Sequence, residues 1–307
     1  MLTYARSGAV ALLLATVTLT LAGCGSATKT ARPGQIVAVG AENEYANVIQ
    51  QIGGRYVSVT AIMSNPNTDP HSFEASPSVA KTVSAARLIV QNGVGYDSFM
   101  DNIEAATANS SRKVITVQKL LGLPNSTANP HLWYSPSTMP AVAAALAKAL
   151  TRMQPHHAAY FSANLRRFDA ALQPWLKAIA HFRATYPGTA VATTEPVGDY
   201  MLQAAGTRNL TPFELQADIM NGVDPAPQDI TLQNGLFSGH KVMVFVYNQQ
   251  VTDTLTQNFK SAAAHAGIPV VGVYETMPLG YSYQGWMLAE VRALQRAVAD
   301  HKSTEKL

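Results

Sequence analysis

Short apolar runs alternate with amphipathic segments along most of the chain. Residues 35–40 (QIVAVG), 56–63 (YVSVTAIM) and 87–93 (RLIVQNG) are apolar or rich in β-branched residues, which predicts buried strands. Between the first two runs, apolar residues recur at helical spacing until Gly53 and Gly54, which form a helix stop. Strands that alternate with helices in this way predict a mostly parallel sheet.

The same alternation returns in the second half of the chain. Residues 189–194 (TAVATT), 241–247 (KVMVFVY) and 268–274 (IPVVGVY) predict strands, and residues 252–266 and 285–299 predict helices. The fold class expected from both halves is α/β, with two lobes built on mostly parallel sheets.

One long amphipathic helix is predicted between the two halves, from Pro155 to about Pro187. Its apolar residues step by four and three in alternation, which places them on a single stripe. About 28 residues at 1.5 Å each span roughly 40 Å, so the helix is long enough to join two lobes rigidly. Core packing is the simplest role for the stripe, which consists of Phe161, Leu165, Phe168, Leu172, Trp175, Ile179 and Phe182.

The start of the chain has the features of an export signal. Arg6 precedes an apolar run, residues 9–21, which is too short and too rich in Thr for a membrane span but fits a signal peptide, residues 1–23. The run closes with LAGC, which resembles a bacterial lipobox, a site where the signal is cut before the Cys and that Cys receives acyl lipid such as palmitate. Cys24 is the only cysteine, and acylation explains an unpaired Cys in an exported protein; the alternative is an incidental Cys. Residues 25–34 are small and polar and predict a flexible tether.

Length and charge limit the protein class. Without residues 1–23, whose one charged residue is Arg6, the chain has 21 Lys and Arg against 19 Asp and Glu, a balance that argues against nucleic-acid binding. About 280 remaining residues are enough for two domains. The predicted division is 1–23 signal peptide, 24–34 tether, 35–154 N-terminal α/β lobe, 155–186 linking helix and 187–307 C-terminal α/β lobe.

Four residues with metal-binding side chains share one structural description. His71 lies in a loop (DPHSFEASP) after an early strand, and His131 lies in NPHLWYSP, just before a predicted helix. Glu195 and Glu275 each follow an apolar strand, at the carboxyl ends where α/β sheets bind ligands. Two imidazoles and two carboxylates suit a divalent first-row metal. The alternatives are a solvated loop histidine and carboxylates that cap helix amino termini.

These motifs resemble a known family, the metal-binding solute receptors of bacterial zinc and manganese ABC importers (cluster 9), over about residues 35–300. VSVTAIMSNPNTDPHSFEASPSVAK is similar to the family's DPHxxExxP segment, and NPHLWYSP to its DPHxWLDP. TTEPVGDYML lies where the family's third ligand falls, often His and in manganese-type members Glu. VVGVYETMPLG lies where the fourth ligand falls, usually Asp. The long helix is similar to the rigid helix that joins the family's two lobes.

The resemblance implies a function. His71, His131, Glu195 and Glu275 would bind a divalent metal cation, Mn or Zn with Fe also possible, and the protein would deliver it to the membrane permease of an ABC importer. It implies a monomeric receptor that is not an enzyme, anchored to membrane lipid through Cys24 on the extracytoplasmic face of the cell membrane.

The chain departs from the family pattern at two positions. Glu275 stands where Asp is usual, and its extra methylene moves the carboxylate by about 1.5 Å. Asn129 stands where Asp is frequent. Asn129, Asp69 and Glu74 are therefore candidates for orienting the ligands or shaping their loops.

The choice of metal is suggested by two features. Zinc-specific members often have a His/Asp-rich loop before the second motif, whereas residues 101–128 contain no His. Together with Glu195, a hard oxygen ligand, this favours manganese or iron over zinc. The remaining histidines are expected on the surface or in packing roles: 156, 157, 181, 240, 265 and 301.

Two other function classes stay open from the residues alone. A metal-dependent hydrolase needs an open metal position and a nearby general base, for which Glu74 is the one candidate, and the sequence has no HExxH motif. A surface adhesin could use the same fold, although the sequence shows no motif for it.

Overall fold

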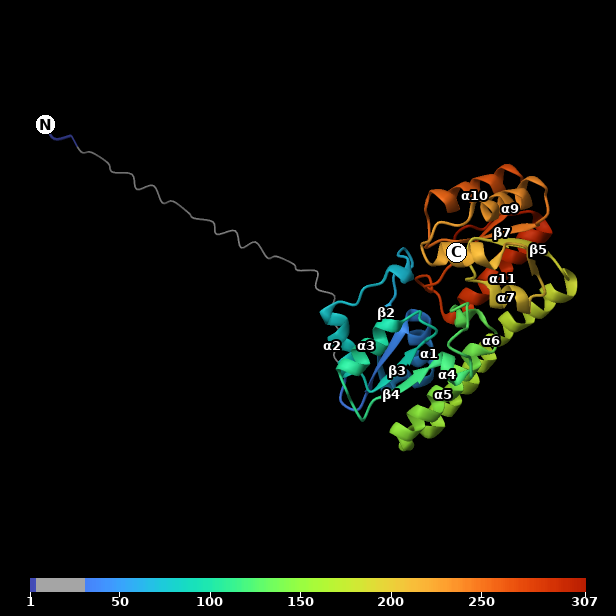
Figure 1. Ribbon diagram of the computed structural model, residues 1–307. Coiled ribbons are helices and arrows are strands. Elements are labelled where there is room, and N and C mark those ends of the chain that lie inside the picture. Colours follow the sequence, from blue (N-terminus) through green and yellow to red (C-terminus); the bar gives the residue numbers. More distant parts are fainter. Residues whose placement is uncertain (4–30) are drawn as a thin grey trace. The chain divides into compact units, whose positions relative to one another are not determined.

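Two four-stranded parallel sheets form the centre of the fold. The computed structural model describes residues 1–3 and 31–307, so Cys24, most of the predicted signal peptide and most of the tether lie outside the described residues. The first sheet has the strand order β2-β1-β3-β4 and the second has the order β6-β5-β7-β8, and every pair is parallel. The predicted α/β class with two parallel-sheet lobes is confirmed (Figure 1).

The first lobe alternates strands and helices as its hydrophobic pattern predicts. Ser76 caps α2 by accepting a hydrogen bond from the Val79 backbone N–H, and Pro77 occupies the first turn, where its missing N–H costs no hydrogen bond. The elements are β1 (Ile36–Glu42), α1 (Asn43–Gly53), β2 (Val57–Met63), α2 (Pro77–Ala85), β3 (Leu88–Gln91), α3 (Ser98–Ala106), β4 (Lys113–Thr116), α4 (Val117–Leu120) and α5 (Thr138–Met153).

The second lobe repeats this alternation of strands and helices. Its elements are β5 (Ala190–Thr193), α7 (Asp199–Ala204), β6 (Arg208–Asn209), α8 (Phe213–Met220), α9 (Pro227–Ser238), β7 (Val244–Asn248), α10 (Thr254–His265), β8 (Val270–Val273) and α11 (Tyr283–Asp300). The edge strands β4 and β6 were not expected from the sequence, because they are only four and two residues long and contain polar, partly exposed positions.

The long helix α6 (Ala158–Thr185) runs past both sheets and packs against α1 and α5 of the first lobe and α7 and α11 of the second (Figure 1). A 3₁₀ turn, Pro155–His157, precedes it, so the helix begins three residues later than Pro155 suggested. Six residues of the predicted stripe are buried and Leu165 is partly buried against the same core. The core role of the stripe is confirmed.

Polar contacts also join the lobes beside the helix. The Asn43 side chain exchanges two hydrogen bonds with the backbone of Met277, at 2.8 and 2.9 Å. The Asn47 side chain accepts one from the Tyr283 backbone N–H at the start of α11. Because the largest hydrophobic cluster also contains residues of both sheets, residues 31–307 form one compact unit. The domain boundaries drawn from the sequence stay a prediction.

None of the helices in the described part of the chain combines the length and the apolar character that crossing a membrane requires.

Candidate metal site

The carboxyl ends of both sheets supply the residues of one buried cluster. His71 lies in a 3₁₀ turn after β2, where the Asp69 carboxylate caps the turn by accepting a hydrogen bond from the His71 backbone N–H at 2.8 Å. His131 precedes a second 3₁₀ turn, Leu132–Tyr134. Glu275 comes two residues after β8. Within residues 31–307, these three side chains form the group whose possible ligand atoms all lie within 4.8 Å of one another.

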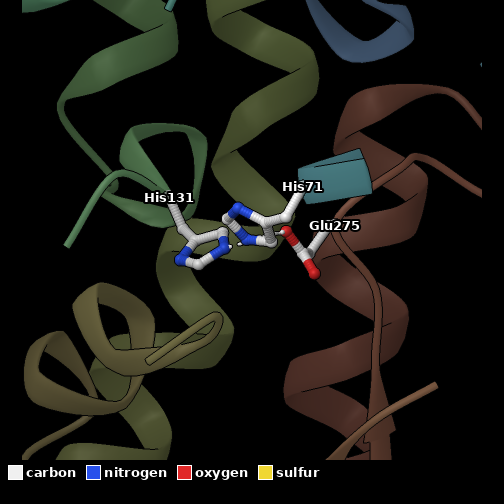
Figure 2. A group of neighbouring side chains, drawn as sticks. All are labelled: His71, His131 and Glu275. Atoms are coloured by element: carbon white, nitrogen blue, oxygen red, sulfur yellow. Dashed lines mark hydrogen bonds and ion pairs between the residues drawn. The ribbon is translucent and has the colours of Figure 1, made fainter. Parts of the chain in front are cut away.

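One oxygen of Glu275 is the meeting point of the cluster. His71 Nε2 and His131 Nε2 each lie 3.1 Å from Glu275 Oε2, and Figure 2 shows both rings pointing at this oxygen. Ligand atoms held about 2.1 Å from one metal ion are themselves roughly 3.0–3.4 Å apart, so this spacing suits a shared cation. His131 and Glu275 are buried, whereas the His71 side chain is 20% exposed.

Asn129 determines which nitrogen of His131 faces the cluster. Its amide N–H donates to the Pro196 carbonyl at 2.7 Å, so its Oδ1 points toward His131 and lies 2.8 Å from Nδ1. Oδ1 accepts a hydrogen bond, and therefore Nδ1 carries the proton and Nε2 presents a lone pair to Glu275 when the ring is neutral. A lone pair facing a carboxylate needs a cation between them, either a proton or a metal. The prediction that Asn129 could orient a ligand agrees with this geometry.

Glu195 lies beside this group but outside it. Asn248, the last residue of β7, donates one amide hydrogen bond to Glu195 Oε1 at 3.0 Å and one to Glu275 Oε1 at 2.7 Å. Glu195 Oε2 is buried and has no hydrogen-bond partner among the described residues. A buried carboxylate oxygen without a donor is costly, which fits a site that takes up a cation.

The electrostatics of the cluster follow from burial and from this convergence. Burial alone would raise the pKa of Glu275, but its contacts with the His131 and His71 imidazoles outweigh burial and hold its pKa well below the ordinary value. Burial lowers the pKa of His131, and Glu275 offsets this effect only in part. At His71, burial also opposes the charged form, but Glu275 and Asp69 together raise the pKa above its usual range. Burial and the charge of Glu275 raise the pKa of Glu195.

Aromatic rings pack against both histidines, and His131 is fully buried. Tyr96 donates a hydrogen bond to Glu275 Oε2 at 3.0 Å and packs edge-on against both imidazoles, and Trp133 packs edge-on against His131. The resulting low local polarity strengthens electrostatic interactions at the cluster.

The sequence analysis missed the residues that position the carboxylates. Gln250 accepts hydrogen bonds from the backbone N–H groups of Glu275 and Thr276, both at 2.8 Å, and donates to the Thr68 carbonyl in the His71 loop at 2.7 Å. Asn248 and Gln250 lie at the carboxyl end of β7, just as Glu195 and Glu275 lie after β5 and β8. Their position could have identified them from the sequence. Glu74, the candidate base, is exposed and lies outside the cluster.

Comparisons with known proteins agree with this architecture. Residues 39–297 match the sequence model of the ZnuA family, the periplasmic component A of a zinc-uptake complex. The manganese-binding lipoprotein MntA of Bacillus subtilis (strain 168) is 28% identical over 181 residues, which are 56% of this chain and 58% of that protein. The chain thus spans little more than half the length of this curated relative.

Solved structures share the fold at low sequence identity. The periplasmic zinc-binding protein TroA from Treponema pallidum gives a TM-score of 0.72 at 15% identity, covering 88% of this chain and 100% of that one. The SBP FpvC from Pseudomonas aeruginosa in complex with Mn2+ gives 0.71 at 18% identity, covering 87% and 99%.

Asn248 provides a direct test of the carboxylate arrangement. We expect Asn248→Ala to weaken metal binding about 10- to 100-fold, because both carboxylates lose the donor that orients them. The measurement is calorimetric titration with Mn and Zn, with thermal unfolding of the metal-free variant to verify folding. Asn234→Ala, on the exposed side of α9, is the matched control and should bind as the wild type does. An Asn248 variant that folds and keeps wild-type affinity would contradict this role.

Proposed function

The chain belongs to the ZnuA family of periplasmic zinc-uptake components, and from that premise we propose that it is an extracytoplasmic receptor that binds Mn or Zn, with Fe also possible. It passes the metal to the membrane permease of an ABC importer. His71, His131, Glu195 and Glu275 are the proposed ligands. The similarity to MntA, a manganese-binding lipoprotein, and to TroA, a zinc-binding protein, supports this choice of metals.

The single observation that carries the proposal is the contact of two imidazole nitrogens with one buried carboxylate oxygen, each at 3.1 Å. His71 and His131 come from the first lobe and Glu275 from the second. A cation bound here would therefore be held by both lobes, and its binding would also stabilise their contact. Glu195 supplies a second carboxylate from the second lobe through Oε2, which no donor within residues 31–307 contacts.

A metal-carrier function explains this site better than metal-dependent hydrolysis does. The one candidate general base, Glu74, is exposed and separate from the cluster. The site is also lined closely by Tyr96, Trp133 and Asn248, which hold the proposed ligands in place. We therefore propose that the protein is a carrier and not an enzyme, and that it acts as a monomer.

Membrane attachment is a separate part of the proposal. The LAGC sequence that ends at Cys24, the only cysteine, supports cleavage after residue 23 and acylation of Cys24. The names of relatives such as the manganese-binding lipoprotein MntA also support a lipid anchor. Residues 25–34 then act as the tether to the globular part of the chain.

The identity of the third ligand can be tested by exchanging its chemistry. Glu195→His replaces a hard oxygen with a borderline nitrogen, so we expect preference for Zn relative to Mn to rise at least tenfold. Wild type and variant are titrated with both metals in the same buffer and salt. Glu214→His, the same exchange at an exposed position of α8, should leave the ratio unchanged. Equal Zn/Mn ratios in all three proteins would mean that Glu195 does not bind the metal.

The lipid anchor can be tested by fractionating cells. Cys24→Ala should move the protein from the membrane fraction to the soluble or secreted fraction, because the acyl chains that provide anchoring are lost. Ser26→Ala, in the same segment, should stay with the membrane. A Cys24→Ala protein that remains in the membrane fraction would show that another feature attaches it.

A further inference from the structure

Basic residues gather where the strands of the first sheet begin. The four strands are parallel, so their amino ends lie along one edge. Arg32 precedes β1, Arg55 precedes β2, Arg87 precedes β3 and Lys113 begins β4, and all four are exposed. A Lys or Arg side chain thus lies at or shortly before the start of every strand of this sheet.

Hydrogen bonds hold these positions together. The Gln35 side chain accepts from the Arg32 backbone N–H at 2.9 Å and donates to the Arg55 carbonyl at 3.0 Å. The backbone N–H of Lys113 donates to the Arg87 carbonyl at 2.8 Å. The four cations therefore share one surface.

The end of α5 extends this surface. Exposed Lys148 and Arg152 line a cavity of about 690 Å³ together with Lys113. Two residues further on, the Gln154 side chain donates a hydrogen bond to the Gly34 carbonyl at 2.6 Å. The last residue of the predicted tether therefore lies beside the end of α5. We call this surface the basic end: Arg32, Arg55, Arg87, Lys113, Lys148 and Arg152.

Little negative charge offsets the basic end. Within residues 31–307, none of its six cations forms a salt bridge. Two carboxylates on α3, Asp101 and Glu104, line the same cavity. The lobe's other carboxylates follow the carboxyl ends of the strands, at the opposite edge: Glu42, Glu44, Asp69, Glu74 and Asp97.

We propose that the basic end binds the headgroups of an anionic lipid membrane, an inference that rests on the proposed lipid anchor. The seven residue steps between Cys24 and Ala31 can span at most roughly 25 Å, so the anchor holds the basic end close to lipid. Each Lys or Arg near an anionic surface strengthens binding about fivefold, within a Debye length of about 8 Å.

The direction of the strands gives this contact a consequence. The first sheet's strands run from the basic end toward the edge that presents His71. With the basic end on lipid, the metal-site edge of this lobe points away from the headgroups and faces the solution from which metal is captured.

The test uses the mature chain without lipid, residues 25–307, in sedimentation with large unilamellar vesicles. We expect binding to vesicles of phosphatidylglycerol and phosphatidylcholine, no binding to phosphatidylcholine alone, and loss of binding at high salt. The triple variant Arg87→Gln, Lys113→Gln, Arg152→Gln should bind about a hundredfold more weakly. The control Arg166→Gln, Lys177→Gln, Lys241→Gln removes the same charge from exposed positions elsewhere and should bind as the wild type does.

Three results would overturn the proposal: no binding to anionic vesicles, equal weakening in both triple variants, or binding to a soluble polyanion such as polyglutamate without binding to vesicles. Because the assayed chain has no lipid, these outcomes are distinguishable from a failure of the Cys24 anchor. Metal titration of each triple variant verifies that the metal site is intact.

Discussion

A buried carboxylate needs compensating donors or cations, and the compensation of Glu275 organises the centre of this protein. Desolvation opposes its charge, yet two imidazoles, the Tyr96 hydroxyl and the Asn248 amide converge on its two oxygens. These groups come from both lobes, so the charge on one side chain draws the lobes together. When the histidines lose their protons, nitrogen lone pairs face the Glu275 carboxylate. A divalent metal can then take the place of the proton between them.

The rest of the fold places these groups within reach of one another. Parallel strands present their carboxyl ends at one edge of each sheet, and His71, Glu195 and Glu275 lie in the loops that follow them, whereas His131 lies between α4 and α5. The helix α6 and the Asn43–Met277 hydrogen bonds join the lobes beside the site. Gln250 then ties the loop of His71 to the backbone of Glu275. These contacts therefore hold the proposed ligands in position before a metal binds.

Much of this architecture could be predicted from hydrophobic periodicity. Continuous apolar runs predicted the fully buried strands, such as β3 and β7. Apolar residues at helical spacing predicted the buried stripe of α6. The edge strands β4 and β6 are short and partly polar, so their pairing depends on neighbours that are distant in sequence. Convergence of His71, His131, Glu195 and Glu275 was expected, because three of them follow predicted strands and His131 precedes a predicted helix.

The position of Glu195 could not be predicted in the same way. Its link to Glu275 through Asn248 depends on β7 lying between β5 and β8, which is a property of the sheet order. Asn129 was considered as an orienting residue, but its role requires the Pro196 carbonyl of the other lobe to fix the amide. Local sequence contains neither piece of information. Whether all four proposed ligands bind the metal remains a prediction.

The most direct test of the central claim is the position of the metal itself. Crystals of the protein loaded separately with Mn and with Zn should each give one strong anomalous peak at the metal's absorption edge. The account predicts a peak about 2.0–2.2 Å from His71 Nε2, His131 Nε2 and a Glu275 carboxylate oxygen, with Glu195 completing the coordination. A peak elsewhere in the molecule, or one that contacts neither histidine, would contradict it.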